Sequence, residues 1–475
     1  MPALRAFDPP PHHVPGHKMI RRSTLLICGF ILIPALASAQ DFTGLGDGVT
    51  FNDPANWVGG VLPIGNADIG PGFNVVLNSN QSFNELDVVG DQNSTPGTAS
   101  IDVQGGTITG GGWIKVGVDV GNDGTYTQSG GTYTGHTQFH IGDNGTGVAE
   151  FSGTANFSST QNTDIGTGTG TGTLDLSGSA VVDNQGGSIN LGNNGTGTLN
   201  IADTSTLNTD QINVANATGT GTVNQTGGTI NANNWVALGQ GSTGVPVYNH
   251  SAGTLNVGLV SMGEALTVGE NATGTYNASG TADINAPFLL VGRDAGGDGL
   301  LEITGSSVAI DLAQELRVGL QSGAGFNDAG ASGELSYIAD AGGVSTIFAD
   351  ATQFGAEGTQ DLTVDLTGDA NFSTFTSFTT GPLMDIAVLV DNSGMIDTDG
   401  DGIDDALAPV IGTFSGLLEG AAVDIGGGQT AFITYTGGDG NDIVLQTFSS
   451  AVPQPSSLAI LALAGIGMMT RRRRS

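Results

Sequence analysis

The chain has 475 residues, 80 of them glycine, and a formal net charge of −34 at pH 7. Residues 40–450 contain 44 of the 45 acidic residues but just three cations, Lys115, Arg293 and Arg317. This balance excludes nucleic acid as a partner, because phosphate binding needs clustered cations. The one cysteine, Cys28, precedes this stretch, which excludes disulfides from it. Divalent cations and neutral or cationic glycans are the expected partners.

The segment before residue 40 has the pattern of a secretory signal peptide. The basic pair Arg21-Arg22 precedes the apolar residues 25–36, and the small residues Ala37-Ser38-Ala39 form a cleavage site. We therefore expect residues 1–39 to direct export. The residues before Met19 are interpreted as an extension from a misassigned start codon, and an unusually long basic region is the alternative.

From residue 81 to residue 340 the sequence repeats a unit of about 25 residues. An aliphatic residue that opens a turn recurs at Val89, Val116, Ile141, Ile165, Leu191, Val214, Leu238, Val268, Val291 and Val318. The stretch LGNNGTGTLN, Leu191–Asn200, is typical, because a glycine-rich corner leads into an alternating strand. A phosphate-binding loop would occur once and would lead into a helix. The glycines therefore indicate structural corners.

One such unit cannot bury its apolar face alone, so successive units must stack. We predict an all-β fold: a right-handed parallel β-solenoid of about ten coils, each with three short strands, over residues 81–340. Ladders of Leu, Ile and Val should face inward, and ladders of Thr, Asn and Asp should face outward. An N-terminal cap is expected at 40–80 and a β-rich C-terminal region at 341–450. Hydrophobic helices are expected in the signal peptide and in residues 451–475.

The C-terminal region contains a candidate calcium loop with the carboxylates Asp397, Asp399, Asp401, Asp404 and Asp405. The first three stand at positions 1, 3 and 5, with glycine at position 6, as in the first half of an EF-hand-type or thrombospondin-type loop. Position 12 is Ala408 instead of a bidentate glutamate. Asp404, Asp405 or the upstream Asp391 would therefore complete the shell. We predict that Ca²⁺ binds here, and a solvated acidic loop is the alternative.

No catalytic pattern is recognisable in the sequence. His136 and His140 would lie about 13 Å apart along one face of a strand, so we interpret them as a solvated or stacked pair and not as metal ligands. A polysaccharide lyase needs a cation near calcium, and a hydrolase needs converging carboxylates. Lys115, Arg293 and Arg317 instead lie near the anchors of separate coils. We therefore expect a protein that is not an enzyme.

The end of the sequence has three elements in order: Val452-Pro453-Gln454-Pro455, an apolar stretch at 458–469, and the cluster Arg471, Arg472, Arg473 and Arg474. This order resembles the PEP-CTERM sorting signal of Gram-negative bacteria, with Gln454 where glutamate is usual. The resemblance implies recognition by an exosortase, a membrane transpeptidase-like enzyme, and sorting to the cell surface or extracellular matrix. It leaves open whether the tail is cleaved or stays in the membrane through its apolar helix. An ordinary membrane anchor is the alternative.

Residues 57–69 and 412–445 are similar to autotransporter-type β-repeat proteins of environmental bacteria. This likeness implies a passenger architecture without self-translocation. We predict a secreted, surface-sorted, non-catalytic β-solenoid that is a structural or adhesive component of the cell surface or extracellular polysaccharide matrix. The alternatives are a polysaccharide-acting β-helix lyase or hydrolase, and an ice-binding protein. Thr-x-Thr spacing at 167–173 is the sequence signal for ice binding.

Overall fold

The computed structural model describes residues 39–90, 95–241, 243–244, 246–260, 265–320, 330–355, 358–372, 383–396 and 406–447. The regular elements of these residues are β-strands and two short 3-10 helices, Pro54–Asn56 and Val58–Gly60. The predicted all-β class is therefore confirmed. The helices expected in the signal peptide and in the tail lie outside the described residues. Among the residues that are described, no helix is long and apolar enough to cross a membrane.

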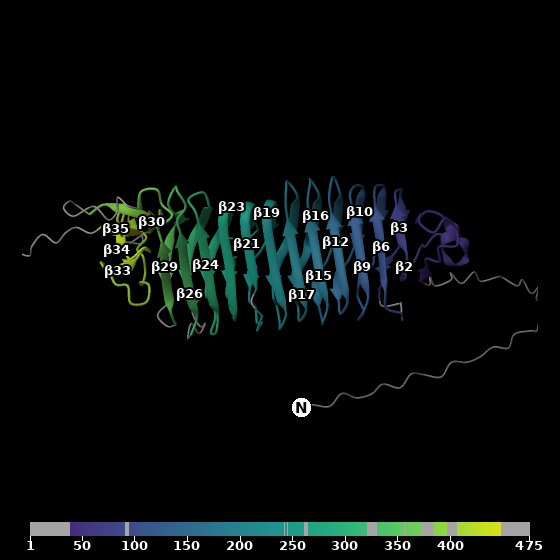
Figure 1. The fold of residues 1–475 in the computed structure, drawn as a ribbon, viewed down its shortest axis with the longest axis horizontal. Coiled ribbons are helices and arrows are strands. Elements are labelled where there is room, and N and C mark those ends of the chain that lie inside the picture. Colours follow the sequence, from purple (N-terminus) through teal and green to yellow (C-terminus); the bar gives the residue numbers. More distant parts are fainter. Residues whose placement is uncertain are drawn as a thin grey trace, which may run out of the picture. The chain divides into compact units, whose positions relative to one another are not determined.

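The strands form three parallel faces, named A, B and C, to which successive turns of the chain contribute (Figure 1). Face A consists of β3 (Asn74–Leu77), β6 (Thr98–Val103), β9 (Asp123–Gln128), β12 (Thr146–Phe151), β15 (Thr171–Leu176), β17 (Thr196–Ile201), the first parts of β19 (Thr220–Ala232), β21 (Val247–Val257) and β23 (Thr273–Val291), and then β24 (Asp298–Thr304), β26 (Ser332–Ile338) and β29 (Gln360–Asp365). These segments pair in parallel throughout. The predicted parallel β-solenoid is confirmed, with about 12 turns.

Faces B and C complete each turn. Face B consists of β4 (Gln81–Ser82), β7 (Thr107–Thr109), β10 (Thr132–His136), β13 (Asn156–Ser159), the first parts of β16 (Val181–Leu191), β18 (Thr206–Val214) and β25 (Ala309–Val318), later parts of β19, β21 and β23, β27 (Ile347–Ala349) and β30 (Asp385–Asn392). Face C consists of β1 (Gln40–Asp41), β2 (Asn66–Ile69), β5 (Glu85–Val88), β8 (Ile114–Val116), β11 (Phe139–Asp143), β14 (Thr163–Thr167), the ends of β16, β18, β23 and β25, β20 (Val236–Leu238), β22 (Ala265–Val268) and β28 (Ala351–Phe354). The longer strands continue around a corner from one face to the next.

The corner between face C and face A determines where each turn closes. The last residue of face C stacks on its counterpart in the next turn, as Ile165 does on Leu191. The residue that follows takes a positive φ, which is 65° at Gly192. A Cβ at Gly192 would lie 2.1 Å from the carbonyl oxygen of Thr220 in the next turn. Both the backbone conformation and the close approach therefore require glycine.

The ten aliphatic anchors predicted from the sequence are the last residues of face C in successive turns, with one error. Val88 pairs with Val116, whereas the expected anchor Val89 occupies the corner itself with a φ of 50°. Ala215 takes the same corner position with a φ of 58°. An aliphatic residue at the corner resembles an anchor in sequence, so spacing alone selected the wrong valine. Parallel pairing also extends beyond 81–340, from β1–β2 to β27–β30, and this adds turns to the stack.

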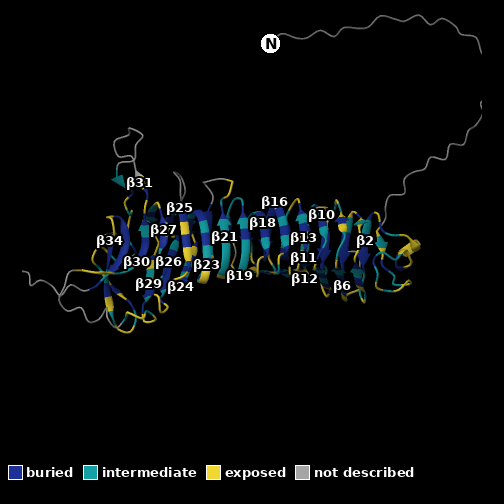
Figure 2. Cartoon of the chain, turned by 90° about the horizontal axis from the view of Figure 1, so that it is seen from above, coloured by how far each residue is buried: buried dark blue, intermediate teal, exposed yellow. Residues whose placement is uncertain are grey.

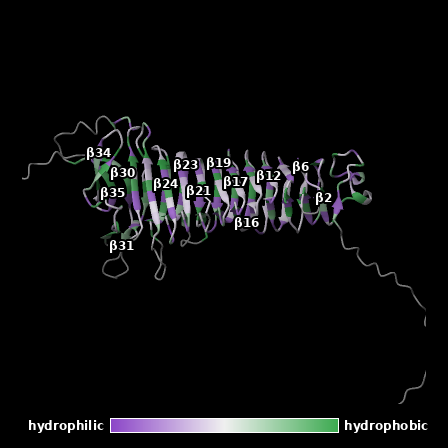
Figure 3. Cartoon of the chain, turned by 60° about the horizontal axis from the view of Figure 1, so that its bottom comes forward, coloured by the Kyte–Doolittle hydropathy of each residue, from purple (hydrophilic) through white to green (hydrophobic). Residues whose placement is uncertain are grey.

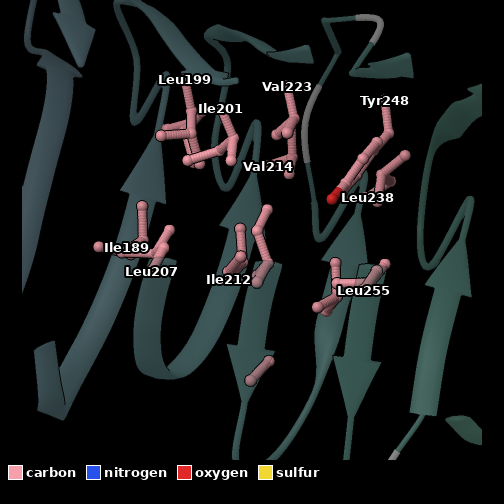
Figure 4. Packing of buried hydrophobic residues seen from close by; sticks show 14 of the residues in the cluster. Ile189, Leu199, Ile201, Leu207, Ile212, Val214, Val223, Leu238, Tyr248 and Leu255 are labelled. Atoms are coloured by element: carbon pink, nitrogen blue, oxygen red, sulfur yellow. The ribbon is translucent and has the colours of Figure 1, made fainter. Parts of the chain in front are cut away.

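Inward apolar residues alternate with outward polar ones. On β17, for example, Leu199 and Ile201 are buried while Asn200 between them is partly exposed. Buried and more exposed positions alternate along the strands in Figure 2, as do hydrophobic and hydrophilic ones in Figure 3. Leu199, Val223 and Tyr248 stack in successive turns, and their side chains point into a common interior (Figure 4). The stacked turns thus share one continuous core.

The two ends of the stack are finished differently. At the first turn, Trp57 packs edge-on against Phe42 and Phe51, and its Nε1 donates to the carbonyl oxygen of Phe51 at 2.7 Å. At the last turn, β30 pairs antiparallel with β35 (Asp442–Gln446), which pairs with β34 (Thr430–Gly437), and β34 pairs with β33 (Ala422–Asp424). The change to antiparallel pairing ends the repeat and occupies an otherwise open strand edge.

Candidate functional site on the outward faces

The outward positions of face A carry a ladder of amide side chains. Asn200 Nδ2 donates to Asp175 Oδ1 at 2.5 Å, and Asn224 Nδ2 donates to Asn200 Oδ1 at 2.8 Å. The same bond continues to Asn249 and Asn277, at 2.9 Å each. An amide has donor and acceptor groups, so asparagine can bond to an identical residue above and below. It then retains one N–H and one lone pair for solvent or a ligand.

Face B carries a second amide ladder. The donated bonds run from Asn231 to Asn208 at 2.9 Å, from Asn256 to Asn231 at 2.9 Å, and from Asn285 to Asn256 at 3.2 Å. The same register continues to Asp311 in the next turn. Outward Asn and Asp ladders are therefore present on two faces, as the repeat pattern predicted.

Threonines form a regular array beside the amide ladder of face A. Three successive strands present Thr-Gly-Thr at the same register: Thr171–Thr173, Thr196–Thr198 and Thr220–Thr222. The first threonine of each strand is exposed and the second is partly exposed. The sequence signal at 167–173 covered only one row of this array. Stacking in register is what turns separate Thr-Gly-Thr segments into a surface.

On the early turns, face C carries charged and aromatic side chains. Lys115 Nζ lies 2.5 Å from Glu85 Oε1 and 3.8 Å from Asp87 Oδ1, and all three side chains are largely buried. Trp113 is 43 % exposed and stacks on His140 of the next turn, with ring centroids 5.1 Å apart and planes at 21°. Glu85 and Asp87 are thus engaged with the lysine.

A groove opens on face B where its amide ladder ends. Its volume is about 540 Å³, and its lining includes Asn256, Asn285 and Asp311 of the ladder together with Leu259 and Phe348. The exposed fraction is 57 % for Leu259 and 47 % for Phe348. Phe348 follows Asp311 in the register of the next turn. An exposed aromatic ring therefore interrupts the polar column, which continues at Asp391 in the next turn.

The predicted calcium loop and sorting residues lie outside the described residues. All five carboxylates of the loop fall within 397–405, between β31 (Met395–Ile396) and β32 (Ala406–Leu407), which pair antiparallel. The sorting residues fall within 452–474. In the described part of the chain, no group of three His, Cys, Asp or Glu side chains could hold a metal ion. Calcium binding stays a prediction.

The expectation that His136 and His140 share one face of a strand is wrong. β10 ends at His136 and β11 begins at Phe139, so a corner separates the two histidines. His136 is buried, and its Nδ1 lies 3.1 Å from the carbonyl oxygen of Gly112. Burial lowers the pKa of His136 to about 4. His140 instead lies outside, stacked on Trp113. The prediction from their spacing of four residues required both histidines to lie on one uninterrupted strand.

A third histidine, His250, belongs to a buried polar network. Its Nδ1 lies 2.9 Å from the hydroxyl of Tyr276, and its Nε2 lies 2.9 Å from the carbonyl oxygen of Gly253. Burial lowers the pKa of His250 to about 4. In the adjacent column, Tyr248 donates its hydroxyl hydrogen to Gln225 Oε1 at 2.7 Å. These groups satisfy one another within the core, which is a structural role.

The cations that the sequence analysis singled out are each paired with carboxylates. Lys115 contacts Glu85 and Asp87 as described above. Arg293 Nη1 lies 2.9 Å from Glu270 Oε1, and burial raises the pKa of that glutamate. Arg317 Nη2 lies 2.5 Å from the carboxylate of Glu315. The three cations thus hold ion pairs in separate turns, as their positions near different anchors indicated.

The aromatic residues of the outward faces were missed by the sequence analysis. For Trp113 a signal existed, because it lies two residues before Lys115, which shares an outward column of face C with His140 and Asp164. A comparison of the residues that precede each anchor would have identified this group of outward aromatic and charged side chains. Phe348 has no such signal, since β27 follows an irregular connection in which the period is lost.

Comparison with known proteins identifies the C-terminal tail. The family model of the PEP-CTERM protein-sorting motif matches residues 451–474, which contain the Val-Pro-Gln-Pro sequence and the arginine cluster. Neither the curated proteins nor the solved structures contain a significant match to the chain. The likeness to autotransporter passengers stays a prediction. The chain carries a PEP-CTERM sorting motif, which implies recognition by an exosortase, export and surface-directed sorting, while its described residues form a parallel β-solenoid.

Proposed function

We propose that this surface-directed solenoid is a non-catalytic structural or adhesive component of the cell surface or extracellular polysaccharide matrix. The observation that carries the proposal is the pair of amide ladders on faces A and B. They offer rows of amide N–H and C=O groups at the spacing of stacked strands, about 4.8 Å. A polysaccharide presents hydroxyl groups at regular intervals. Many individually weak hydrogen bonds along one face would then add up to stable attachment.

Charge narrows the class of polysaccharide. Residues 40–450 contain 44 acidic residues and three cations, and the described structure pairs those cations with carboxylates. A polyanion would be repelled by this surface unless divalent cations bridged the two. Neutral or cationic glycans are therefore the proposed partners.

We further propose that Asp397, Asp399, Asp401, Asp404 and Asp405 bind Ca²⁺. Carboxylate oxygens suit a hard cation, and the antiparallel pairing of β31 with β32 holds the two ends of this segment together. Bound Ca²⁺ would lower the negative charge beside the last turns. The apolar stretch at 458–469 would place the tail in the membrane during or after sorting.

The test uses the full-length chain and the matrix polysaccharide of the producing organism. Co-sedimentation is measured in Ca²⁺ and in chelator, and new reducing or unsaturated ends are assayed in the same samples. Binding without new ends supports the adhesive proposal, and its loss in chelator and in the Asp399→Asn variant assigns a role to calcium. Release of new ends would overturn the non-catalytic proposal in favour of a lyase or hydrolase.

The threonine array of face A favours ice binding as a second candidate function. Its hydroxyl and methyl groups repeat at about 4.8 Å between turns and about 6.6 Å along each strand, close to repeats of the oxygen lattice in ice. Thr198→Tyr would disrupt the array, whereas Thr206→Tyr on face B is the matched control. Thermal hysteresis that is lost only in Thr198→Tyr would support this function. No hysteresis in the unmodified protein would eliminate it.

A further inference from the structure

We propose that the groove at the end of the face B ladder, lined by Asn256, Asn285, Asp311 and Phe348, binds a short segment of a neutral hexose polymer. This inference rests on the proposed adhesive function and gives it a defined site and ligand class. The groove volume of about 540 Å³ lies within the range of small-molecule sites, about 300–1,000 Å³.

The register places the four residues in one line along the stack. Asn256 pairs with Asn285, Asn285 with Asp311, and Asp311 with Phe348, each in the next turn. Successive positions are thus about 4.8 Å apart. A hexose residue in an extended chain has a similar length, so successive sugars would meet successive turns of the protein.

The polar groups of this line are available to a ligand. Asn285 Nδ2 donates to Asn256 Oδ1 at 3.2 Å, and this bond leaves its carbonyl oxygen free of any bond from Asp311, since an ionised carboxylate cannot donate. Asp311 is exposed, and within the described residues its carboxylate has neither a hydrogen bond nor an ion pair. The ladder therefore changes at Asp311 from self-paired amides to an unused acceptor, which suits the hydroxyl groups of a sugar.

The ring of Phe348 adds an apolar surface to this row of polar side chains. Phe348 is 47 % exposed and occupies a register position that carries Asn or Asp in the preceding turns. A ring there contributes little to the core, because it points outward. The C–H groups on one face of a hexose can pack against such a ring. Leu259, which is 57 % exposed, adds a second apolar surface to the same groove.

Charge selects the neutral class of sugar. The described lining contains no lysine or arginine, and its one charged side chain is that of Asp311. An anionic sugar would approach this carboxylate and the acidic surface of residues 40–450 without a compensating cation. The ladder of face A offers equivalent amides but has no exposed aromatic ring at its register, so a comparison of the two ladders isolates the contribution of the ring.

Affinity electrophoresis of the full-length chain tests the inference, with hydroxyethylcellulose, galactomannan and dextran as neutral probes and polygalacturonate as the anionic probe. We expect at least one neutral probe to retard the protein and polygalacturonate not to. Phe348→Ala should weaken this binding about tenfold, Phe348→Trp should preserve it, and Asp311→Ala should weaken it several-fold. Leu418→Ala, which removes another exposed apolar residue, should leave it unchanged. Asn224→Ala, in the ladder of face A, tests whether the probes bind to that ladder instead of the groove. Unfolding midpoints establish that each variant is folded.

The outcomes separate the groove from the proposed function. If neutral probes bind but only Asn224→Ala weakens them, adhesion resides on face A and the groove inference is overturned. If the matrix polysaccharide binds while the neutral probes do not, or if polygalacturonate binds as tightly as they do, the ligand class is wrong although adhesion stands. If neither the matrix nor any probe binds, both proposals fall.

Discussion

The early turns on face C and the central turns on face A occupy one fold but stabilise their outward columns by different means. Asp87, Lys115 and His140 follow one another in register on face C, where the Lys115 ammonium pairs with the buried Asp87 carboxylate. On face A, Asn200 and Asn224 repeat the same side chain, and each amide bonds to the next. A charged column depends on every member because one deletion leaves a charge unpaired. An amide column tolerates a gap, because the remaining amides can bond to water.

Replacing Lys115 should have the largest effect of the changes considered. Lys115→Met would leave Glu85 and the almost fully buried Asp87 without their cation. We expect the free energy of unfolding to fall by about 3–5 kcal/mol, as measured by urea denaturation. Lys115→Arg is the control that retains the charge. A loss below about 1 kcal/mol in the Met variant would show that the charged column of face C tolerates the loss of one member as well as the amide column of face A does.

The glycine corners should matter equally in the two regions. Gly117 and Gly192 follow anchors in the charged and amide regions, and a Cβ would meet the carbonyl oxygen of Thr146 or Thr220 in the next turn. Each substitution by alanine should cost about 3 kcal/mol. Ala215→Gly is the reverse change at an equivalent corner, and it should raise stability by about 1 kcal/mol. Thermal unfolding of the three variants measures both signs, and equal losses in all three would contradict this explanation.

The buried histidines predict how stability depends on pH in both regions. His136 and His250 have pKa values lowered from 6.5 to about 4, so the unfolded chain binds more protons than the folded chain between these values. Their stabilising contribution is full above pH 6.5 and is lost as the pH falls towards 4. Between pH 7 and pH 5 we expect a loss of about 2 kcal/mol per histidine in urea unfolding. His250→Gln should reduce this pH dependence, and an unchanged slope would count against the assignment.

The smallest expected effect concerns the amide ladder. Asn224→Ala removes one rung while its neighbours can bond to water, so the free energy of unfolding should fall by about 1 kcal/mol or less. Asn224→Asp should cost more, because a carboxylate cannot donate to Asn200 Oδ1. Urea denaturation of both variants measures the order. A larger loss for Ala than for Asp would show that the ladder acts through packing and not through donated hydrogen bonds.

The repeat itself could be read from the chain. Corner glycines recur because a positive φ and a close approach of the next turn disfavour other side chains, although Val89 and Ala215 occupy two of these corners. A recurring glycine such as Gly192 therefore marks the corner in the sequence. The alternation of Leu199, Asn200 and Ile201 likewise assigns inward and outward positions without knowledge of the neighbours. The sorting signal could be read because its three elements are contiguous. The corner glycines and the alternation of apolar and polar residues thus determined the solenoid and its outward polar columns. The order of three contiguous elements in the tail identified the sorting signal.

Only the tertiary structure decided which residues meet between turns. Trp113 contacts His140 and Asp311 precedes Phe348 because stacking brings together residues that are about one turn apart, and turn lengths vary with their corners. A one-residue error in register moves a side chain to the opposite face of a strand, and at Val89 it exchanges the last strand position for the corner. The corner between His136 and His140 has the same consequence within one turn. Register is a property of the stacked turns, so the groove on face B and the ion pairs on face C became visible only in three dimensions.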